Sequence, residues 1–207
     1  MKSFAGLSAE KQKHIINAAL TCFGMTGYKK TSIYDIAEAA SISKAMVFHY
    51  FGTKLEMYMY LANYVVQFMI AEYQNSLTQI PPQQTDFFDQ ILCSTKLKVT
   101  LMKEHPAILQ FVHTMFLEQD PDVRPFIDTL LSQGQALRQS FSLQHFDHHK
   151  FKANVDVHTM ISMLTWMIEG YLHKAQANTP PELDQAMHVF TDSIIMMKQN
   201  FYKEEYV

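Results

Sequence analysis

Two short predicted helices, within residues 31–54, carry the side chains that could bind a macromolecular partner. On the second of them, the outward positions are expected to be Lys44, Ala45, His49 and Tyr50. A lysine ammonium or an imidazole N–H can donate to a phosphate or to the edge of a guanine, and Ala45 or Met46 can contact a thymine methyl group. The chemistry that these residue types predict is recognition of double-stranded DNA.

The surrounding residues predict how these side chains are positioned. Ser32 and Asp35 fit a capping box, which starts a helix that ends near Ala40. Ser43 can cap a second helix that continues through Phe51. The small residues 39–41 allow the two helices to cross closely, which is typical of a helix-turn-helix. The apolar positions of the second helix, expected to pack inward, are Val47, Phe48 and Phe51.

Charge is distributed unevenly along the chain. The net charge is −3, but residues 1–54 hold seven lysines against three acidic residues and so carry +4, which leaves −7 for the rest. A basic segment on an acidic body is expected if only that segment contacts phosphates. Chance clustering of solvated charges is the alternative reading of the same numbers.

Composition indicates an all-α protein. The chain has 207 residues, 48% of them hydrophobic, with only six glycines and seven prolines and no alternating strand-like runs. A three-helix head (1–52) is expected to precede a larger helical body (53–207), with about nine helices in total. A long helix is expected to begin at Thr53 and to tie the head to the body.

No membrane partner or export is expected. The most apolar stretch, 58–70, is interrupted by Asn63 and Gln67, and the first residues lack the apolar core of a signal peptide. Cys22 and Cys93 each stand alone in a helical pattern, which favours small core residues over a disulfide. We therefore expect a cytoplasmic protein.

The last two predicted helices indicate self-association. In the helix 156–176, one apolar face is formed by Val157, Ile161, Leu164, Ile168 and Leu172, and the nearly opposite face by Met163, Trp166, Met167 and Gly170. The final helix adds a stripe that includes Phe190, Ile194 and Met197. A helix with two apolar faces needs two partners, so these residues predict a homodimer interface. The alternative is that both faces are buried within one subunit.

The body contains soft, adaptable side chains that could line a ligand pocket. The candidates are Tyr64, Phe68, Phe88, Thr95, Met102, Phe111 and Met115. Methionine and aromatic side chains suit an apolar or aromatic molecule better than a highly charged one. The same residue types also build ordinary cores, so that reading stays open.

Metal and enzymatic functions are the rival class, a helical-bundle metal-binding protein or enzyme with no role on DNA. The residues His145, Asp147, His148 and His149 are crowded and lack a matching Cys or Glu set. Di-metal bundle sites need Glu-x-x-His pairs, and the sequence contains none. No catalytic residue, cofactor or metal is therefore predicted.

Three segments of the sequence resemble the head of the tetracycline-repressor (TetR) family of bacterial regulators. They are Thr31-Ser32-Ile33-Tyr34-Asp35-Ile36-Ala37, Ala40-Ser41-Ile42-Ser43-Lys44 and Phe48-His49-Tyr50-Phe51-Gly52-Thr53-Lys54. The resemblance covers about the first quarter of the chain. It implies a homodimer with two heads on a palindromic operator and a small-molecule effector site in each body. Release of a repressor by its ligand is the expected mechanism, with activation as the alternative.

The resemblance also implies roles for single residues. Thr31 corresponds to a phosphate contact ahead of the first helix, Tyr50 to a phosphate or base contact, and Lys54 to a phosphate clamp. The groove-facing positions are Lys44, Ala45, Met46 and His49, with Ser43 at the cap. Two departures stand out: Ser41 replaces a usual glycine, and Phe48 replaces a usual tyrosine, so a hydroxyl contact from position 48 is lost and Phe48 is expected to pack.

Overall fold

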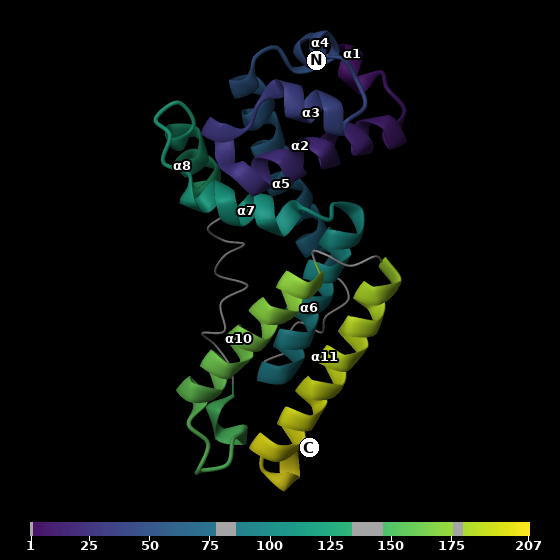
Figure 1. Cartoon of the computed structure of the whole chain (residues 1–207). Helices are drawn as coiled ribbons and strands as arrows, with labels where there is room; N and C mark the ends of the chain where they lie inside the picture. The colour runs from purple at the N-terminus through teal and green to yellow at the C-terminus, as the bar shows by residue number, and fades with distance from the viewer. Residues whose placement is uncertain (1, 78–85, 134–146, 176–179) are drawn as a thin grey trace. The chain divides into compact units, whose positions relative to one another are not determined.

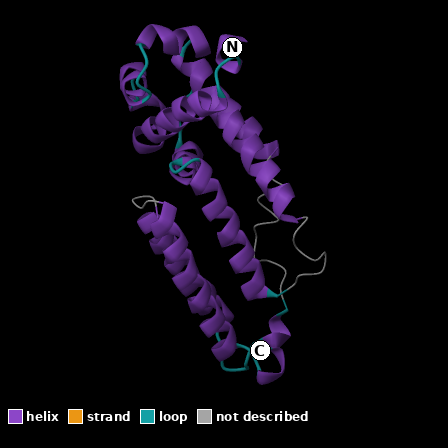
Figure 2. Cartoon of the chain, turned by 90° about the vertical axis from the view of Figure 1, so that its right-hand side faces the viewer, coloured by secondary structure: helices purple, strands orange, loops and turns teal. Residues whose placement is uncertain are grey.

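The computed structural model describes residues 2–77, 86–133, 147–175 and 180–207, and its regular elements there are helical (Figure 1). Colouring by secondary structure shows no strand in these ranges (Figure 2), and Phe151 and Tyr202 form an isolated antiparallel bridge. The expectation of an all-α protein is confirmed. The elements are α1 (Lys2–Ala5), α2 (Ala9–Lys30), α3 (Ile33–Ala39), α4 (Lys44–Phe51), α5 (Lys54–Leu77), α6 (Phe87–Glu104), α7 (Ile108–Leu117), α8 (Arg124–Gln133), α10 (Val157–Ala175) and α11 (Pro180–Phe201), with the 3-10 turns η1 (His148–Lys150) and η2 (Glu204–Tyr206).

The chain forms two compact units. Unit 1 contains Met1–Glu72 and Glu104–Arg138, and unit 2 contains Tyr73–Lys103 and Gln139–Val207. Unit 1 therefore joins the predicted head to α7, α8 and most of α5. These units are defined by internal contacts. The predicted boundary at residue 52 instead separates DNA binding from ligand binding, and it stays a prediction.

In unit 1, α2 and α7 pack closely at a residue without a side chain. A Cβ atom at Gly24 would lie only 3.1 Å from the backbone nitrogen of Phe111, so a larger residue there would push the helices apart. The hydroxyl of Thr114 donates to the carbonyl of Gly24 at 2.7 Å. The contact therefore fixes α7 against the helix that leads into the head.

The end of α2 bends at Gly27, which adopts a φ of 76°. The helix continues beyond this kink and ends at Lys30. Glycine suits this position because side chains rarely adopt a positive φ. The carboxylate of Glu118, at the end of α7, accepts from the backbone N–H of Tyr28 at 2.8 Å and holds the kink.

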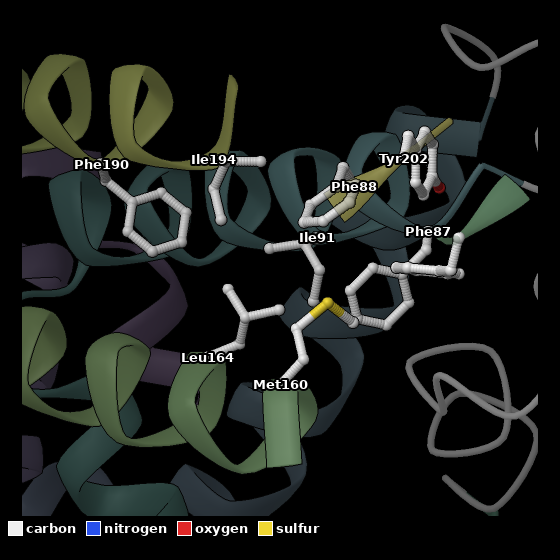
Figure 3. Packing of buried hydrophobic residues seen from close by; sticks show 9 residues of the cluster. Phe87, Phe88, Ile91, Met160, Leu164, Phe190, Ile194 and Tyr202 are labelled. Carbon is white, nitrogen blue, oxygen red and sulfur yellow. The ribbon is translucent and has the colours of Figure 1, made fainter. Parts of the chain in front are cut away.

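Unit 2 is built around an apolar core between α6, α10 and α11. Figure 3 shows Ile91 pointing toward Met160 and Leu164, with Phe88 beside Tyr202, and the core cluster also contains Phe87, Phe151, Phe190 and Ile194. Burying each such side chain stabilises the fold by roughly 1.5–3 kcal/mol.

An ion-pair network closes one end of this unit. Nζ of Lys198 lies 3.2 Å from a carboxylate oxygen of Asp86 and 3.1 Å from one of Asp89, and Nζ of Lys150 lies 3.3 Å from Asp86. The network joins the start of α6 to the end of α11 and to η1. Both cysteines are free in the structure, and no helix in the described ranges is long and apolar enough to cross a membrane.

Candidate nucleic-acid interface

The helix-turn-helix is started by the predicted capping residues. The backbone N–H of Asp35 donates to Oγ of Ser32 at 3.1 Å, and the N–H of Ser32 donates back to the carboxylate of Asp35 at 3.4 Å. Oγ of Ser43 accepts from the N–H of Met46 at 3.2 Å. Each cap satisfies backbone donors that the helix itself leaves without partners. Both predicted helix starts are confirmed.

The turn between α3 and α4 depends on Ser41. Its φ is 52°, in the left-handed region that favours glycine. The N–H of Ile42 donates to the carbonyl of Ala37 at 3.0 Å, which closes the turn. The family's usual glycine is thus replaced without loss of the conformation that glycine favours.

The exposed side of α4 carries most of the predicted groove-facing residues. Lys44, Ala45, Met46 and His49 are all exposed, whereas Val47, Tyr50 and Phe51 are buried. Phe48, expected to pack inward, is 43% exposed, and that expectation is wrong. Its ring adds apolar surface beside Lys44, whose Nζ lies 5.8 Å from the ring centroid.

Tyr50 is only 3% exposed, so the outward orientation predicted for it is also wrong. Its ring lies 5.8 Å from that of Phe4 in α1, and Phe4 also contacts Phe51 at 4.7 Å between centroids. The inward positions are 47, 50 and 51, spaced three and four residues apart, and α1 covers them. Tyr50 therefore supports the recognition helix from behind.

Thr31 is also buried, with 3% exposure, which conflicts with a side-chain phosphate contact. Its hydroxyl donates to the carbonyl of Gly27 at 2.7 Å and lies 2.7 Å from the hydroxyl of Thr26. The hydroxyl is thus used within the protein, where it caps the end of α2. For this reason, a phosphate contact by the Thr31 side chain is not retained.

Lys54 anchors the start of α5 to the end of α2. Its Nζ donates to the carbonyls of Thr31 at 3.0 Å and Lys29 at 3.3 Å, and lies 4.6 Å from the ring centroid of Tyr28. The side chain is part-exposed. Its contact with phosphate stays a prediction, and the structure adds a bracing role that sequence reasoning missed.

Further exposed groups near these helices were not predicted as contacts. Lys29 and Lys30 are exposed at the end of α2, and Tyr34 on α3 is 63% exposed. The positive charge of residues 1–54, to which the two lysines contribute, was the sequence signal that could have identified them. A tyrosine within a seven-residue helix gives no such signal, because two turns are too short to define a face.

Residues 15–61 match the sequence model that describes the tetR family of bacterial regulatory proteins. The matched segment contains α3, the turn and α4, together with most of α2 and the start of α5. Solved structures of family members share the fold along nearly the whole chain. The helix-turn-helix region of the chain therefore matches the tetR family.

The relatives agree with this assignment. The chain is 26% identical over 138 residues to the HTH-type transcriptional regulator YuxN of Bacillus subtilis, a match that covers 67% of this chain and 44% of that protein. A TetR family transcriptional regulator from Chloroflexus aurantiacus superposes with a TM-score of 0.57 at 19% identity over 99% of each chain. The ketosteroid transcriptional regulator KstR2 of Mycobacterium tuberculosis superposes with a TM-score of 0.63 at 16% identity, over 96% of this chain and 97% of that one.

At these identities the structural likeness shows a shared fold and nothing further. The chain spans less than half the length of the curated relative that it matches. Together, the family match and the curated relative show a helix-turn-helix like that of the tetR regulators in this chain.

The predicted dimer face of this chain includes exposed residues on α10. Trp166 is 70% exposed, Met163 is exposed, and Gly170 has no heavy atom within 4 Å of the position that a Cβ would take. Met167, assigned to the same face, is part-buried against the unit 2 core. The α10 face therefore exposes apolar surface, and its role in a homodimer stays a prediction.

The predicted dimer residues on α11 face the other way. Phe190 and Ile194 are buried in the core of unit 2, and Met197 packs against it part-buried, so their assignment to an outward face is wrong. The exposed apolar side chains of α11 are Val189, Ile195 and Met196. Both stripes of α11 are apolar, so sequence periodicity could not tell the inner stripe from the outer one.

The candidate ligand residues of the body fall into separate environments. In unit 1, Tyr64 and Phe68 stack with their centroids 6.0 Å apart, and both contact the ring of His105. Phe111 and Met115 are buried in the same unit, and Phe88 belongs to the unit 2 core. Thr95 and Met102 are buried on α6.

His105 was missed by sequence reasoning and sits at the centre of a hydrogen-bonded set in unit 1. Its Nδ1 donates to Oδ1 of Asn17 at 2.6 Å, and its Nε2 accepts from the hydroxyl of Tyr64 at 2.7 Å. Burial, and then the positive charge of Lys13, lower the pKa of His105 to about 4. The ring is therefore neutral near pH 7 and links α2 to α5.

The histidine-rich segment gives no support to a metal site. His145 lies outside the described residues, and Asp147 pairs with Lys150 at 3.0 Å. Among the residues that the structure describes, no three His, Cys, Asp or Glu side chains are grouped as metal ligands.

Proposed function

We propose that this TetR-family regulator is a homodimeric repressor that binds a palindromic operator and releases it when a small ligand binds the body. The observation that carries the DNA-binding part is the division of α4 into two sides. Its exposed side presents Lys44, Ala45, Met46 and His49. Its buried side, with Tyr50 and Phe51 against Phe4, gives that surface a rigid base.

The functional groups fit the major groove of DNA. Lys44 and His49 supply donors for guanine or phosphate, and Ala45 and Met46 supply apolar atoms for thymine methyl groups. The exposed lysines at the end of α2 lie beside the segment that leads into α3, where they can contact phosphates. We therefore assign residues 1–52 to DNA binding and residues 53–207 to ligand binding and dimerisation.

Dimerisation is proposed through the exposed apolar faces of α10 and α11. The exposed apolar side chains are Met163 and Trp166 on α10 and Val189 and Met196 on α11. They stay in water unless a second copy covers them, and the open space at Gly170 allows a close approach. Binding of a dimer to a palindromic site requires two copies of α4 about 34 Å apart, one turn of the duplex.

Ligand control is proposed to act through α5. Lys54 holds the first turn of this helix to the carbonyls of Thr31 and Lys29, so a shift of α5 is transmitted to the residues that precede α3. A ligand that prefers the released state tenfold supplies about 1.4 kcal/mol of coupling. An apolar or aromatic ligand fits the residue types of the body, and repression is proposed over activation.

Selection of random DNA by the purified protein tests the proposal. Recovery of a palindrome whose half-sites lie one helical turn apart supports a dimeric operator-binding protein. Titration of that sequence at two salt concentrations then separates specific binding from phosphate contacts. Recovery of no sequence, with only weak salt-sensitive binding, would contradict it.

A further inference from the structure

Helix α6 carries a lysine in the middle of its buried face. Lys98 follows Phe87 and Ile91 by eleven and seven residues and precedes Met102 by four, so at 3.6 residues per turn all four lie on one side of the helix. Those three neighbours are buried. Lys98 itself is part-buried. A charged residue in such an apolar stripe is uncommon without a partner.

No partner for this ammonium is found in the described part of the chain. The other lysines of unit 2 that approach acidic groups are paired: Lys103 with Asp184, and Lys150 and Lys198 with Asp86. Lys98 has no ion pair or hydrogen bond among the described residues. Burial lowers its pKa, as expected for an ammonium with no compensating negative charge.

A second unsatisfied group lies one turn earlier on the same face. Oγ1 of Thr95 is fully buried and has no hydrogen-bond partner among the residues that the structure describes. Several other helical threonines donate to the carbonyl four residues before them, as Thr100 on the same helix does to Lys96 at 3.1 Å and Thr191 does to Met187 at 2.9 Å. Thr95 does not make this bond, so its hydroxyl is left with nothing to bind.

We propose that Lys98 and Thr95 form the anion-binding end of a ligand site on α6, and that the ligand is an apolar molecule that carries one carboxylate. An ammonium and a hydroxyl three residues apart offer donors to the two oxygens of a carboxylate. Ile91 and Met102 on the same face supply apolar contact for the remainder. The inference rests on the proposed ligand control and adds the chemical class of the ligand.

The test compares carboxylates with neutral molecules of the same shape. The full-length protein without DNA is titrated calorimetrically with octanoate, decanoate and 2-naphthoate. Each carboxylate is compared with the corresponding primary alcohol, and all are kept below their micelle concentrations. At least one carboxylate is expected to bind wild type about tenfold or more tightly than its alcohol. In Lys98→Met this preference is expected to fall about tenfold, while alcohol affinity stays within about threefold. Thr95→Val is expected to lose part of the preference.

Lys96→Met is the matched control, because Lys96 is an exposed lysine on the same helix. It should keep the wild-type preference. Without ligand, Lys98→Met should raise the melting temperature by about 3 °C or more, since it removes an uncompensated charge, and Lys96→Met should leave it unchanged.

Three outcomes would overturn the inference: no carboxylate preferred over its alcohol, an equal preference in Lys98→Met, or a lower melting temperature for Lys98→Met than for Lys96→Met. These outcomes leave operator selection unaffected. Conversely, failure to select an operator, with the carboxylate preference intact, would contradict the DNA-binding proposal and support the site on α6.

Discussion

Lys44 and Lys54 carry the same charge but have different surroundings. Lys44 is exposed and its nearest aromatic group is Phe48, whereas Lys54 donates to two backbone carbonyls and lies over Tyr28. Removal of Lys44 should therefore change DNA binding without changing the fold. Removal of Lys54 should affect both.

Lys44→Ala is expected to weaken operator binding with little change in stability. If the ammonium reads a base edge, specific binding should weaken by about 1–3 kcal/mol and sequence preference should relax at one position. If it contacts phosphate only, affinity should fall evenly across sequences. Fluorescence anisotropy on the selected operator and on single-base variants measures the difference. Unchanged affinity, with Lys96→Ala as the control, would remove Lys44 from the interface.

His105 should make stability depend on pH. Its pKa is lowered to about 4, whereas an unfolded histidine titrates near 6.5, so between these values the unfolded chain binds more protons. The free energy of unfolding should therefore fall as pH drops from about 6.5 to 4, by no more than about 3 kcal/mol, and should not change above about pH 7.5 from this group.

Urea denaturation at pH 7.5, 6.0 and 5.0 measures this slope for wild type and for His105→Gln. The variant should be less stable at pH 7.5, because Asn17 and Tyr64 lose hydrogen bonds, but its stability should fall less between pH 6.0 and 5.0. Equal slopes in the two proteins would assign the dependence to other histidines.

At the scale of the element, the turn between α3 and α4 depends on one backbone conformation. Ser41 holds a φ of 52°, which a β-branched residue tolerates poorly. Ser41→Val should therefore destabilise the protein by roughly 1–2 kcal/mol and weaken operator binding. Thermal unfolding measures the first effect, with Ser41→Gly expected to be neutral or stabilising. A valine variant as stable as wild type would show that the turn can rearrange.

Helix starts could be predicted from sequence because capping is local. The Ser32–Asp35 pair and the Ser43 cap each join residues three apart. Their hydrogen bonds can therefore be predicted without knowledge of the tertiary structure. The inward face of α4 could not be predicted as well. The choice between Phe48 and Tyr50 depends on Phe4, whose short helix α1 has no periodic signal of its own.

The longer helices show the same limit in another form. Periodicity predicted apolar stripes on α10 and α11, but which stripe of α11 packs inward depends on the core that Phe88 and Ile91 supply. On α6, Phe88, Thr95 and Met102 were predicted as ligand residues, but Lys98 was overlooked because hydrophobic periodicity ignores a charged residue within an apolar stripe.

At the scale of the whole molecule, Trp166→Arg tests the proposed dimer. The side chain is 70% exposed in one subunit, so a charge there should leave the subunit folded but prevent an apolar face from being buried against a second copy. Sedimentation should show monomers, and operator affinity should fall sharply. Thr165→Arg, at an exposed neighbouring position of α10, is the control. A dimeric Trp166→Arg would refute the proposed face.

The contacts of Glu118 and Thr114 with α2 bear on any attempt to transplant the DNA-binding head into another scaffold. A chimera cut at residue 52 would keep Gly24 and the kink at Gly27 but would lose both α7 side chains. The donor for Gly24 and the acceptor for Tyr28 would then have to come from the host. A hybrid biosensor built on this head should therefore carry α7 with it, or choose a host with a carboxylate and a hydroxyl at the equivalent places.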